Sequence, residues 1–421
     1  MAIAHAQLPY IPASGVQGVT TFFVLSGFLI TTLLLREREQ RGRIDLRAFW
    51  GRRALRLLPA LIVFVSVTGL FWWLLGMITL NAFIRAVLPV LFYYGNFTRT
   101  YGWDVGLGPF PHTWSLAVEE QFYLVWPLFM IVALIVVRRL REPARSIALI
   151  STLVAFTVVS AGWRVVVGLS PGPNYNGVHL LPHTTVFSMT AGAAFAVVYT
   201  RGWRPGRWVV PASFVAVPGF LLLPKLLGSH YGGWVIGPVF YTLFALLLIA
   251  MVCGPSWTLF EFPPIRAIGT VSYGWYLWHM PAMLLVTDPK LHMPHRTASE
   301  VAALLFTLGI AGVSWHFIEK PILTRYKTRL ERVKVRGQAE APVPAGEPRP
   351  VPATTEQPVP ATTEPRPVPA ATEQPVPAKG PQPIPAGAGA SRLIGLRDTL
   401  VPPEHLVPAH EPGTPGAYSR P

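Results

Sequence analysis

The chain of 421 residues is 51% hydrophobic and only 13% charged, with a mean hydropathy of +0.42. Soluble domains carry about 25% charged residues, so this composition excludes a soluble globular protein and predicts one embedded in lipid. The net charge of +15 does not indicate nucleic-acid binding, because the arginines lie in short clusters between apolar runs. The single cysteine, Cys253, excludes an intrachain disulfide and a Cys-rich zinc site, and is more typical of a structural residue than of a nucleophile.

Nine segments are long and apolar enough to cross a bilayer, which takes about 20 mostly apolar residues. They lie at 17–35, 56–76, 118–137, 147–168, 184–200, 208–224, 234–252, 271–287 and 299–319. The sequence therefore predicts an all-α fold, a polytopic membrane helical bundle of about nine spans. A tenth, shorter apolar stretch at 83–97 is ambiguous.

The basic clusters orient the predicted bundle. Segment 36–56 holds eight arginines, and further clusters lie at 138–145, 201–207 and 320–336. All four clusters fall on one side of the membrane if the nine segments cross and 83–97 does not. We therefore expect 83–97 to be re-entrant or interfacial, the clusters to be cytoplasmic, and residues 1–16 and 98–117 to lie outside.

The composition changes at about residue 337, and 21 of the 44 prolines follow that point. A near-repeat of PVPATTEQ cannot bury a core or form helices, so 337–421 is predicted to be a disordered, cytoplasmic, Pro-rich tail. Binding of this tail by a partner domain that recognises polyproline is an alternative that the sequence leaves open. The predicted organisation is a membrane domain at 1–325, a basic juxtamembrane segment at 326–336, and the tail.

The stretch from His112 to Tyr123 (HTWSLAVEEQFY) concentrates polar groups at the start of a predicted span. Ser115 and Glu119 share a helical face with His112, and Glu120 and Gln121 follow. Thr113 or Ser115 would serve as N-cap, and acids in a first turn stabilise a helix dipole. Capping explains one glutamate but not two, and ionisable groups at membrane depth indicate function. We therefore expect Ser115, Glu119 and Glu120 in a catalytic site at the outer side.

His279 lies within SYGWYLWH, where Ser272, Tyr276 and His279 share a helical face. Two interpretations explain this histidine equally well: a catalytic role, or a place in an aromatic belt from which its side chain extends toward the membrane surface. His5 is the only side chain of residues 1–16 that titrates near neutral pH, and physical reasoning alone favours no role for it.

Arg52, Arg53 and Arg56 stand at the cytoplasmic mouth of span 56–76. Guanidinium groups one helical turn apart can bind phosphate oxygens, so these arginines are candidates for holding a phosphate-rich cytoplasmic cofactor. Positive-inside anchoring explains them equally well. The chain has no Walker motif, Rossmann fingerprint or His-Glu-x-x-His, which disfavours an ATP-driven pump and a metalloprotease, and no metal is expected.

The chain resembles acyltransferase family 3, the bacterial membrane O-acyltransferases, over roughly residues 1–325. The resemblance rests on four motifs in order: FFVLSGFLIT at 22–31, RRALRLLP at 52–59, HTWSLAVEEQFY at 112–123 and SYGWYLWH at 272–279. It implies transfer of an acyl group, commonly acetyl, from acyl-CoA to a sugar hydroxyl of a cell-surface glycan, glycolipid or glycosylated metabolite. It also implies a location in the bacterial plasma membrane, with the lipid bilayer and a saccharide acceptor as partners.

The resemblance further implies that His5 matches the family's first-span histidine, with the basic residue ten positions before it, and most of that span, missing. Full-length members have about ten spans. Acyl-CoA is then expected to bind near Arg52, Arg53 and Arg56, and a histidine, His5, to act as general base. Ser115 as a covalent acyl relay would need a base such as His112 beside it. Two alternatives remain: a transporter or flippase of lipid-linked saccharide, and a truncated inactive homologue.

Overall fold

The computed structural model describes residues 15–102, 107–170, 175–227, 232–254, 261–288 and 296–339. Every regular element within these ranges is helical, which confirms the predicted all-α fold. The helices are α2 (Gly15–Arg41), α3 (Leu46–Leu74), α4 (Leu80–Leu91), α5 (Gly95–Tyr101), α6 (Thr113–Val136), α7 (Ala144–Leu169), α8 (Tyr175–His179), α9 (Pro182–Thr200), α10 (Val209–Leu227), α11 (Gly237–Val252), α12 (Pro263–Thr287), α13 (Arg296–Ser314) and α14 (Lys320–Ala339).

The chain forms two compact units, one of residues 1–324 and 396–421 and one of residues 325–395. In the second unit the described residues, 325–339, are helical. His5 lies outside the described residues. So does the predicted Pro-rich tail, apart from residues 337–339, which end α14. The predicted domain boundaries therefore stay predictions.

Seven helices in the described part of the chain are long and apolar enough to cross a membrane. They are Gly15–Arg41, Leu46–Leu74, Thr113–Arg139, Ala144–Leu169, Asn176–Thr200, Gly233–Val252 and Thr297–Tyr326. Their outward side chains are apolar, such as Val136 and Val159, which are 74% and 71% exposed. The chain is thus a multi-pass membrane protein.

The predicted count of nine spans is not confirmed. Segment 208–224 forms α10, whose apolar part is shorter than a span. Segment 271–287 lies in α12, a 25-residue helix that contains Arg266, Ser272 and His279. Segment 83–97 divides into α4 and α5, and the 12 residues of α4 cover only about 18 Å, too little to cross a hydrocarbon core of about 30 Å.

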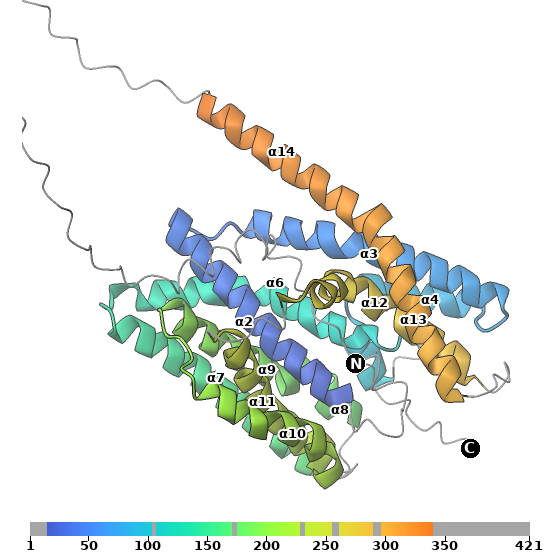
Figure 1. Cartoon of the computed structure of the whole chain (residues 1–421), viewed down its shortest axis with the longest axis horizontal. Helices are drawn as coiled ribbons and strands as arrows, with labels where there is room; N and C mark the ends of the chain where they lie inside the picture. The colour runs from blue at the N-terminus through green and yellow to red at the C-terminus, as the bar shows by residue number, and fades with distance from the viewer. Residues whose placement is uncertain are drawn as a thin grey trace, which may run out of the picture. The chain divides into compact units, whose positions relative to one another are not determined.

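Two apolar cores meet at α6. The first core is formed by α2, α6, α7 and α9, and includes Trp114 and Phe122 of α6. The second is formed by α3, α4 and α12 with Leu116 of α6. Figure 1 shows α6 running between these groups of helices. Polar side chains of α6 therefore face other helices instead of lipid.

The crossing of α2 and α9 depends on two glycines (Figure 1). A Cβ atom at Gly27 would lie 1.8 Å from the carbonyl oxygen of Met189, and one at Gly192 would lie 1.9 Å from that of Val24. Membrane helices associate largely through close packing, so small residues at the crossing allow the backbones to touch. The contact fixes the position of Ser26, which is next to Gly27.

Gly27→Ala should destabilise the protein by about 2 kcal/mol or more, because the methyl group overlaps backbone atoms that cannot move aside. Gly162→Ala in α7 is the matched control, since a Cβ there meets nothing within 4 Å. Unfolding in detergent by sodium dodecyl sulfate titration measures both. Equal stability of the two variants would contradict the close crossing.

Candidate active site

The motif from His112 to Tyr123 forms the first turns of α6. His112 occupies the N-cap position, so the predicted N-cap at Thr113 or Ser115 was wrong. Thr113 is already inside the helix, and its hydroxyl donates back to the carbonyl oxygen of Phe110 at 2.8 Å. The helix therefore begins with Ser115 in its first turn and Glu119 in its second.

A group of charged and hydroxyl side chains surrounds the buried Glu119, and we call it the carboxylate cluster: Ser26, Arg53, Glu119, Glu120 and Tyr123. Arg53 and Glu120 are each 16% exposed. Ser26 Oγ donates to Glu119 Oε1 at 3.2 Å, and the Tyr123 hydroxyl donates to the same oxygen. Arg53 Nη2 lies 3.0 Å from Glu120 Oε1 and 3.6 Å from Glu119 Oε1. One guanidinium thus faces two carboxylates contributed by one helix.

The tyrosine of the cluster also holds the arginine. The Arg53 guanidinium carbon lies 3.5 Å from the centre of the Tyr123 ring, a close cation–π contact. Trp50 Nε1 donates to the Tyr123 carbonyl oxygen at 3.1 Å, which ties α3 to α6 at this level. Glu119, with only 2% of its side chain exposed, is the most deeply buried member of the ion pairs.

These contacts correct the predicted depths of two residues. The sequence placed Arg53 at the cytoplasmic mouth and Glu119 at the outer boundary, but the two side chains touch and so share one depth. The reason is that α3 begins at Leu46, ten residues before the predicted span. Arg53 is then two turns inside its helix, as Glu119 is inside α6.

The three predicted phosphate-binding arginines lie in different surroundings. Arg52 Nη2 is 3.7 Å from Glu37 Oε2, and its side chain is 26% exposed. Arg53 belongs to the carboxylate cluster. Arg56 is 2% exposed and interacts electrostatically with Glu319, which is 3% exposed and accepts a hydrogen bond from Ser314.

A second buried polar group, the histidine cluster, joins α6 to α12 through His112, Ser115, Tyr276 and His279. The Tyr276 hydroxyl lies 2.5 Å from the His112 carbonyl oxygen and 3.1 Å from Ser115 Oγ. The rings of His112 and His279 are edge to face with centres 5.7 Å apart. The tertiary structure therefore brings His279 to the motif that begins at His112.

The protonation of His279 follows from its backbone contact. Its Nδ1 lies 2.6 Å from the carbonyl oxygen of Tyr276, which can only accept a hydrogen bond. The neutral ring therefore carries its proton on Nδ1, and Nε2 is the basic nitrogen. His279 is 2% exposed, so its side chain faces other helices and does not snorkel toward the membrane surface, while its catalytic role stays a prediction.

Ser115 lies between the carbonyl oxygen of His112, 3.3 Å away, and the Tyr276 hydroxyl. Gln121 binds the loop after α4 and the start of α5 instead, since its Nε2 lies 2.8 Å from the Tyr93 carbonyl oxygen and 2.9 Å from Asn96 Oδ1. The polar side chains at the start of α6 thus contact three different parts of the bundle. The glutamates contact α3, Ser115 contacts α12, and Gln121 contacts the segment after α4. The sequence pattern could not show this division, because it places residues on a helix face without saying what faces them.

Cys253 lies just after α11, where burial raises the pKa of its thiol to about 12. The thiol is therefore protonated at neutral pH, which disfavours nucleophilic attack, and the structural role predicted for it stays a prediction. Among the described residues, no group of three or more His, Cys, Asp or Glu side chains is placed to hold a metal ion.

Sequence reasoning missed the partners of the predicted residues. Ser26 and Tyr123 stand inside quoted motifs, but nothing in the sequence paired them with Glu119. Arg164 was missed although a signal was present: it is an arginine within an apolar span, and such residues are functional candidates by default. It is 1% exposed.

Comparison with known proteins now decides the family. The sequence profile of the family described as an acyltransferase domain matches residues 1–316. The chain belongs to this acyltransferase family. The resemblance stated from the four motifs is thereby confirmed.

The chain is similar to several named members of this family. It is 33% identical over 335 residues to the peptidoglycan O-acetyltransferase OatA of Listeria monocytogenes, with 73% of this chain and 51% of the relative covered. It is 33% identical over 329 residues to the putative peptidoglycan O-acetyltransferase YrhL of Bacillus subtilis, with 74% and 51% covered. It is 30% identical over 330 residues to the O-acetyltransferase OatA of Staphylococcus aureus, with 74% and 53% covered.

The chain thus spans about half the length of the curated relatives it matches. No solved structure matches it.

Arg53→Leu should lower the free energy of unfolding by about 2–4 kcal/mol, because it removes the guanidinium that faces the buried Glu119 and the partly buried Glu120. Arg52→Leu is the matched control and should cost about 1 kcal/mol or less, since its ion pair with Glu37 is partly exposed. Denaturant titration of the purified variants measures both losses.

A double variant separates charge from packing. Glu120→Gln added to Arg53→Leu should recover part of the lost stability, because one of the two carboxylates is then neutral. No recovery would contradict the ion-pair interpretation of this contact.

Proposed function

We propose that the membrane domain, residues 1–325, is an O-acyltransferase that moves an acetyl group from acetyl-CoA to a sugar hydroxyl of a cell-envelope glycan. The carboxylate cluster carries this proposal, because a buried and a partly buried carboxylate held by one arginine are costly in a membrane bundle and indicate function. The relatives are named as peptidoglycan O-acetyltransferases, which supports peptidoglycan as the glycan.

The reaction needs a base and a place for a developing charge. The acceptor hydroxyl oxygen attacks the thioester carbonyl carbon, so a C–O bond forms and the C–S bond breaks. The hydroxyl proton passes to the base, and the departing CoA thiolate takes up a proton. An imidazole with a pKa of about 6.5 can accept the hydroxyl proton and then donate a proton to the CoA thiolate.

His5 is the proposed general base, and this role rests on the resemblance of its motif. Glu119 or Glu120 would orient the imidazole or bind the sugar. Within the described residues His279 offers a second imidazole, whose Nδ1–H is directed to the Tyr276 carbonyl oxygen so that Nε2 can receive a proton. The less favoured variant uses Ser115 as an acyl relay, with His112 as its neighbouring base.

The three arginines would divide the binding of acetyl-CoA. Arg52 is partly exposed and pairs with Glu37 in the last turns of α2, which suits contact with phosphates of the donor. Arg53 and Arg56 lie deeper among carboxylates, which suits positioning of the reacting groups. No metal enters this mechanism.

The setting of the enzyme is part of the proposal. We place it in the bacterial plasma membrane, with the basic clusters and the Pro-rich tail in the cytoplasm and the saccharide acceptor outside. A polyproline-binding domain is a candidate partner for the tail, and nucleic acid is not a partner.

Glu119→Gln should lower the rate of acetyl transfer by about 100-fold or more, because the neutral amide cannot polarise or orient a catalytic base. The assay uses the purified full chain in proteoliposomes with labelled acetyl-CoA and a peptidoglycan fragment, and detects the O-acetylated sugar by mass spectrometry. Transfer at the normal rate by Glu119→Gln would remove this residue from the mechanism.

Glu142→Gln is the matched control. Its carboxyl lies outside the spans, where the Ser146 hydroxyl and then Arg201 hold the pKa of Glu142 below its usual value, and it should transfer acetyl normally. If the wild-type chain moves sugar across the vesicle membrane without an acetylated product, the transporter alternative replaces the enzyme.

A further inference from the structure

Helix α4 ends at a tyrosine in a backbone conformation that favours glycine. Tyr93 has a φ of 53°, and in the described part of the chain it is the one non-glycine residue with a positive φ. The N–H groups of Tyr93 and Tyr94 donate to the carbonyl oxygens of the last turn at 3.4 and 3.0 Å, the pattern of a Schellman motif. Glycine is the usual residue at this position, because a side chain there is strained. Such strained residues persist where their surroundings hold them, and they gather at active sites.

Gln121 holds the backbone of Tyr93 in place. Its Nε2 donates to the carbonyl oxygen of Tyr93 at 2.8 Å and to Asn96 Oδ1 at 2.9 Å. Asn96 Nδ2 in turn donates to the carbonyl oxygen of Leu180 at 3.3 Å. Gln121 belongs to the motif at the start of α6, next to Glu120, and the proposed mechanism gives it no role.

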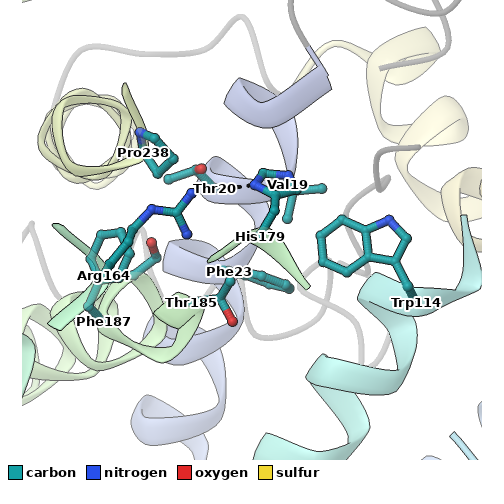
Figure 2. A pocket seen from close by; sticks show the side chains of 10 residues that line it. Val19, Thr20, Phe23, Trp114, Arg164, His179, Thr185, Phe187 and Pro238 are labelled. Carbon is teal, nitrogen blue, oxygen red and sulfur yellow. Dashed lines mark hydrogen bonds between the residues drawn. The ribbon is translucent and has the colours of Figure 1, made fainter. Parts of the chain in front are cut away.

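The connection between α8 and α9, which contains Leu180, is itself held by a buried arginine. Arg164 Nη1 donates to the carbonyl oxygens of Val178 and Thr184 at 2.8 and 3.0 Å, on either side of Leu180. Arg164 Nη2 lies 3.4 Å from His179 Nδ1, and Figure 2 shows these two side chains pointing toward each other. The hydrogen bonds that begin at the end of α4 therefore lead to a rigid part of the bundle.

The side chain of Tyr93 lies near the carboxylate cluster. Its phenol interacts electrostatically with Glu120, Arg53 and Glu119, and its ring packs against the second apolar core. Tyr93 follows α4, outside the membrane spans, and burial followed by the negative charge of Glu120 raises the pKa of its hydroxyl. The hydroxyl is therefore protonated at neutral pH and can donate a hydrogen bond.

This donor is available to a ligand. Within the residues that the structure describes, no protein group forms a hydrogen bond with the Tyr93 hydroxyl. Tyr93 is partly exposed, as are Glu120 and Arg53 at 16% each, whereas Glu119 is 2% exposed. Charged side chains of a membrane bundle face its interior or water instead of lipid. The side of the cluster beside Tyr93 is therefore the side that a ligand can reach.

The charges of the cluster favour a neutral ligand. Two carboxylates, Glu119 and Glu120, face the single guanidinium of Arg53, so negative formal charge exceeds positive charge and disfavours the phosphates of the donor. A sugar hydroxyl is neutral and both donates and accepts. Its O–H can donate to the carboxylate of Glu120 while its oxygen accepts from the phenol of Tyr93.

We propose that Tyr93 binds the acceptor, with its phenol donating to a sugar hydroxyl whose own proton is directed to Glu120, and that Gln121 positions Tyr93 for this contact. The inference rests on the proposed function and adds a residue that binds the acceptor to it. Tyr93 forms and breaks no covalent bond.

Tyr93→Phe tests the inference, because it removes the hydroxyl and keeps the ring. The full chain in proteoliposomes is assayed with labelled acetyl-CoA and a peptidoglycan fragment, and the concentration of each substrate is varied in turn. Loss of one hydrogen bond weakens binding by about three- to tenfold. We expect KM for the fragment to rise by that factor and KM for acetyl-CoA to change by less than about twofold.

Tyr94→Phe is the matched control. It removes the same hydroxyl from the adjacent residue, for which no hydrogen bond or ion pair with the carboxylate cluster is found among the described residues, and both KM values should stay unchanged. Tyr93→Phe should fold, because its hydroxyl holds no other part of the described protein and its ring packing remains. A thermal melt in detergent checks this.

Gln121→Leu tests the positioning role. It should also raise KM for the fragment, and adding it to Tyr93→Phe should raise this KM no further, because Gln121 acts through the Tyr93 hydroxyl. Independent effects of the two substitutions overturn this role. If Gln121→Leu fails to fold, Gln121→Glu removes the amide donor with little change in shape and is expected to behave in the same way.

An unchanged KM for the fragment in Tyr93→Phe, or a rise in KM for acetyl-CoA instead, overturns the inference alone when the wild type transfers acetyl normally. A wild-type chain that transfers no acetyl group to the fragment overturns the proposed function.

Discussion

The ionic contact between Arg53 and the two glutamates of α6 constrains the whole bundle. Moving a carboxylate or guanidinium out of water costs several kcal/mol per ion unless its partners are well placed. Arg53 meets both Glu119 and Glu120 within 3.6 Å, and its guanidinium covers the Tyr123 ring. Because these groups come from α3 and α6, neither helix can shift along the other without separating buried charges.

The rest of the packing supports this contact. The crossing of α2 and α9 at Gly27 and Gly192 brings Ser26 to Glu119, which adds a hydroxyl donor from a third helix. On the other side of α6, Tyr276 and His279 of α12 meet His112 and Ser115. Helix α6 therefore carries two polar sites, and each faces one of the two apolar cores.

The arginines of this protein differ in what they contact, and this difference gives them different roles. Arg52 is partly exposed beside Glu37, Arg53 faces carboxylates, and Arg164 donates to backbone carbonyl oxygens. A carboxylate neutralises an arginine, whereas carbonyl dipoles fix its orientation and leave its charge in place. Arg164 is therefore held in one orientation by carbonyl dipoles, whereas Arg53 holds two carboxylates of one helix.

The sequence by itself determined that the protein lies in a membrane, that its fold is helical, and which family it belongs to. Low charge and long apolar runs require lipid, and four short motifs identify the acyltransferase family. The polar residues of α6 and His279 were found from their position at membrane depth, where a polar side chain is costly. These properties are local, so they can be read along one chain.

Only the tertiary structure decided which polar side chains contact one another and how deep in the bundle each of them lies. Arg53 and Glu119 are 66 positions apart, and helix periodicity cannot show that they meet. The early start of α3 at Leu46 placed Arg53 inside the bundle, although the apolar pattern began only at residue 56. The contact of Arg164 with the carbonyl oxygen of Val235 likewise arises from helix packing, because the two residues are 71 positions apart.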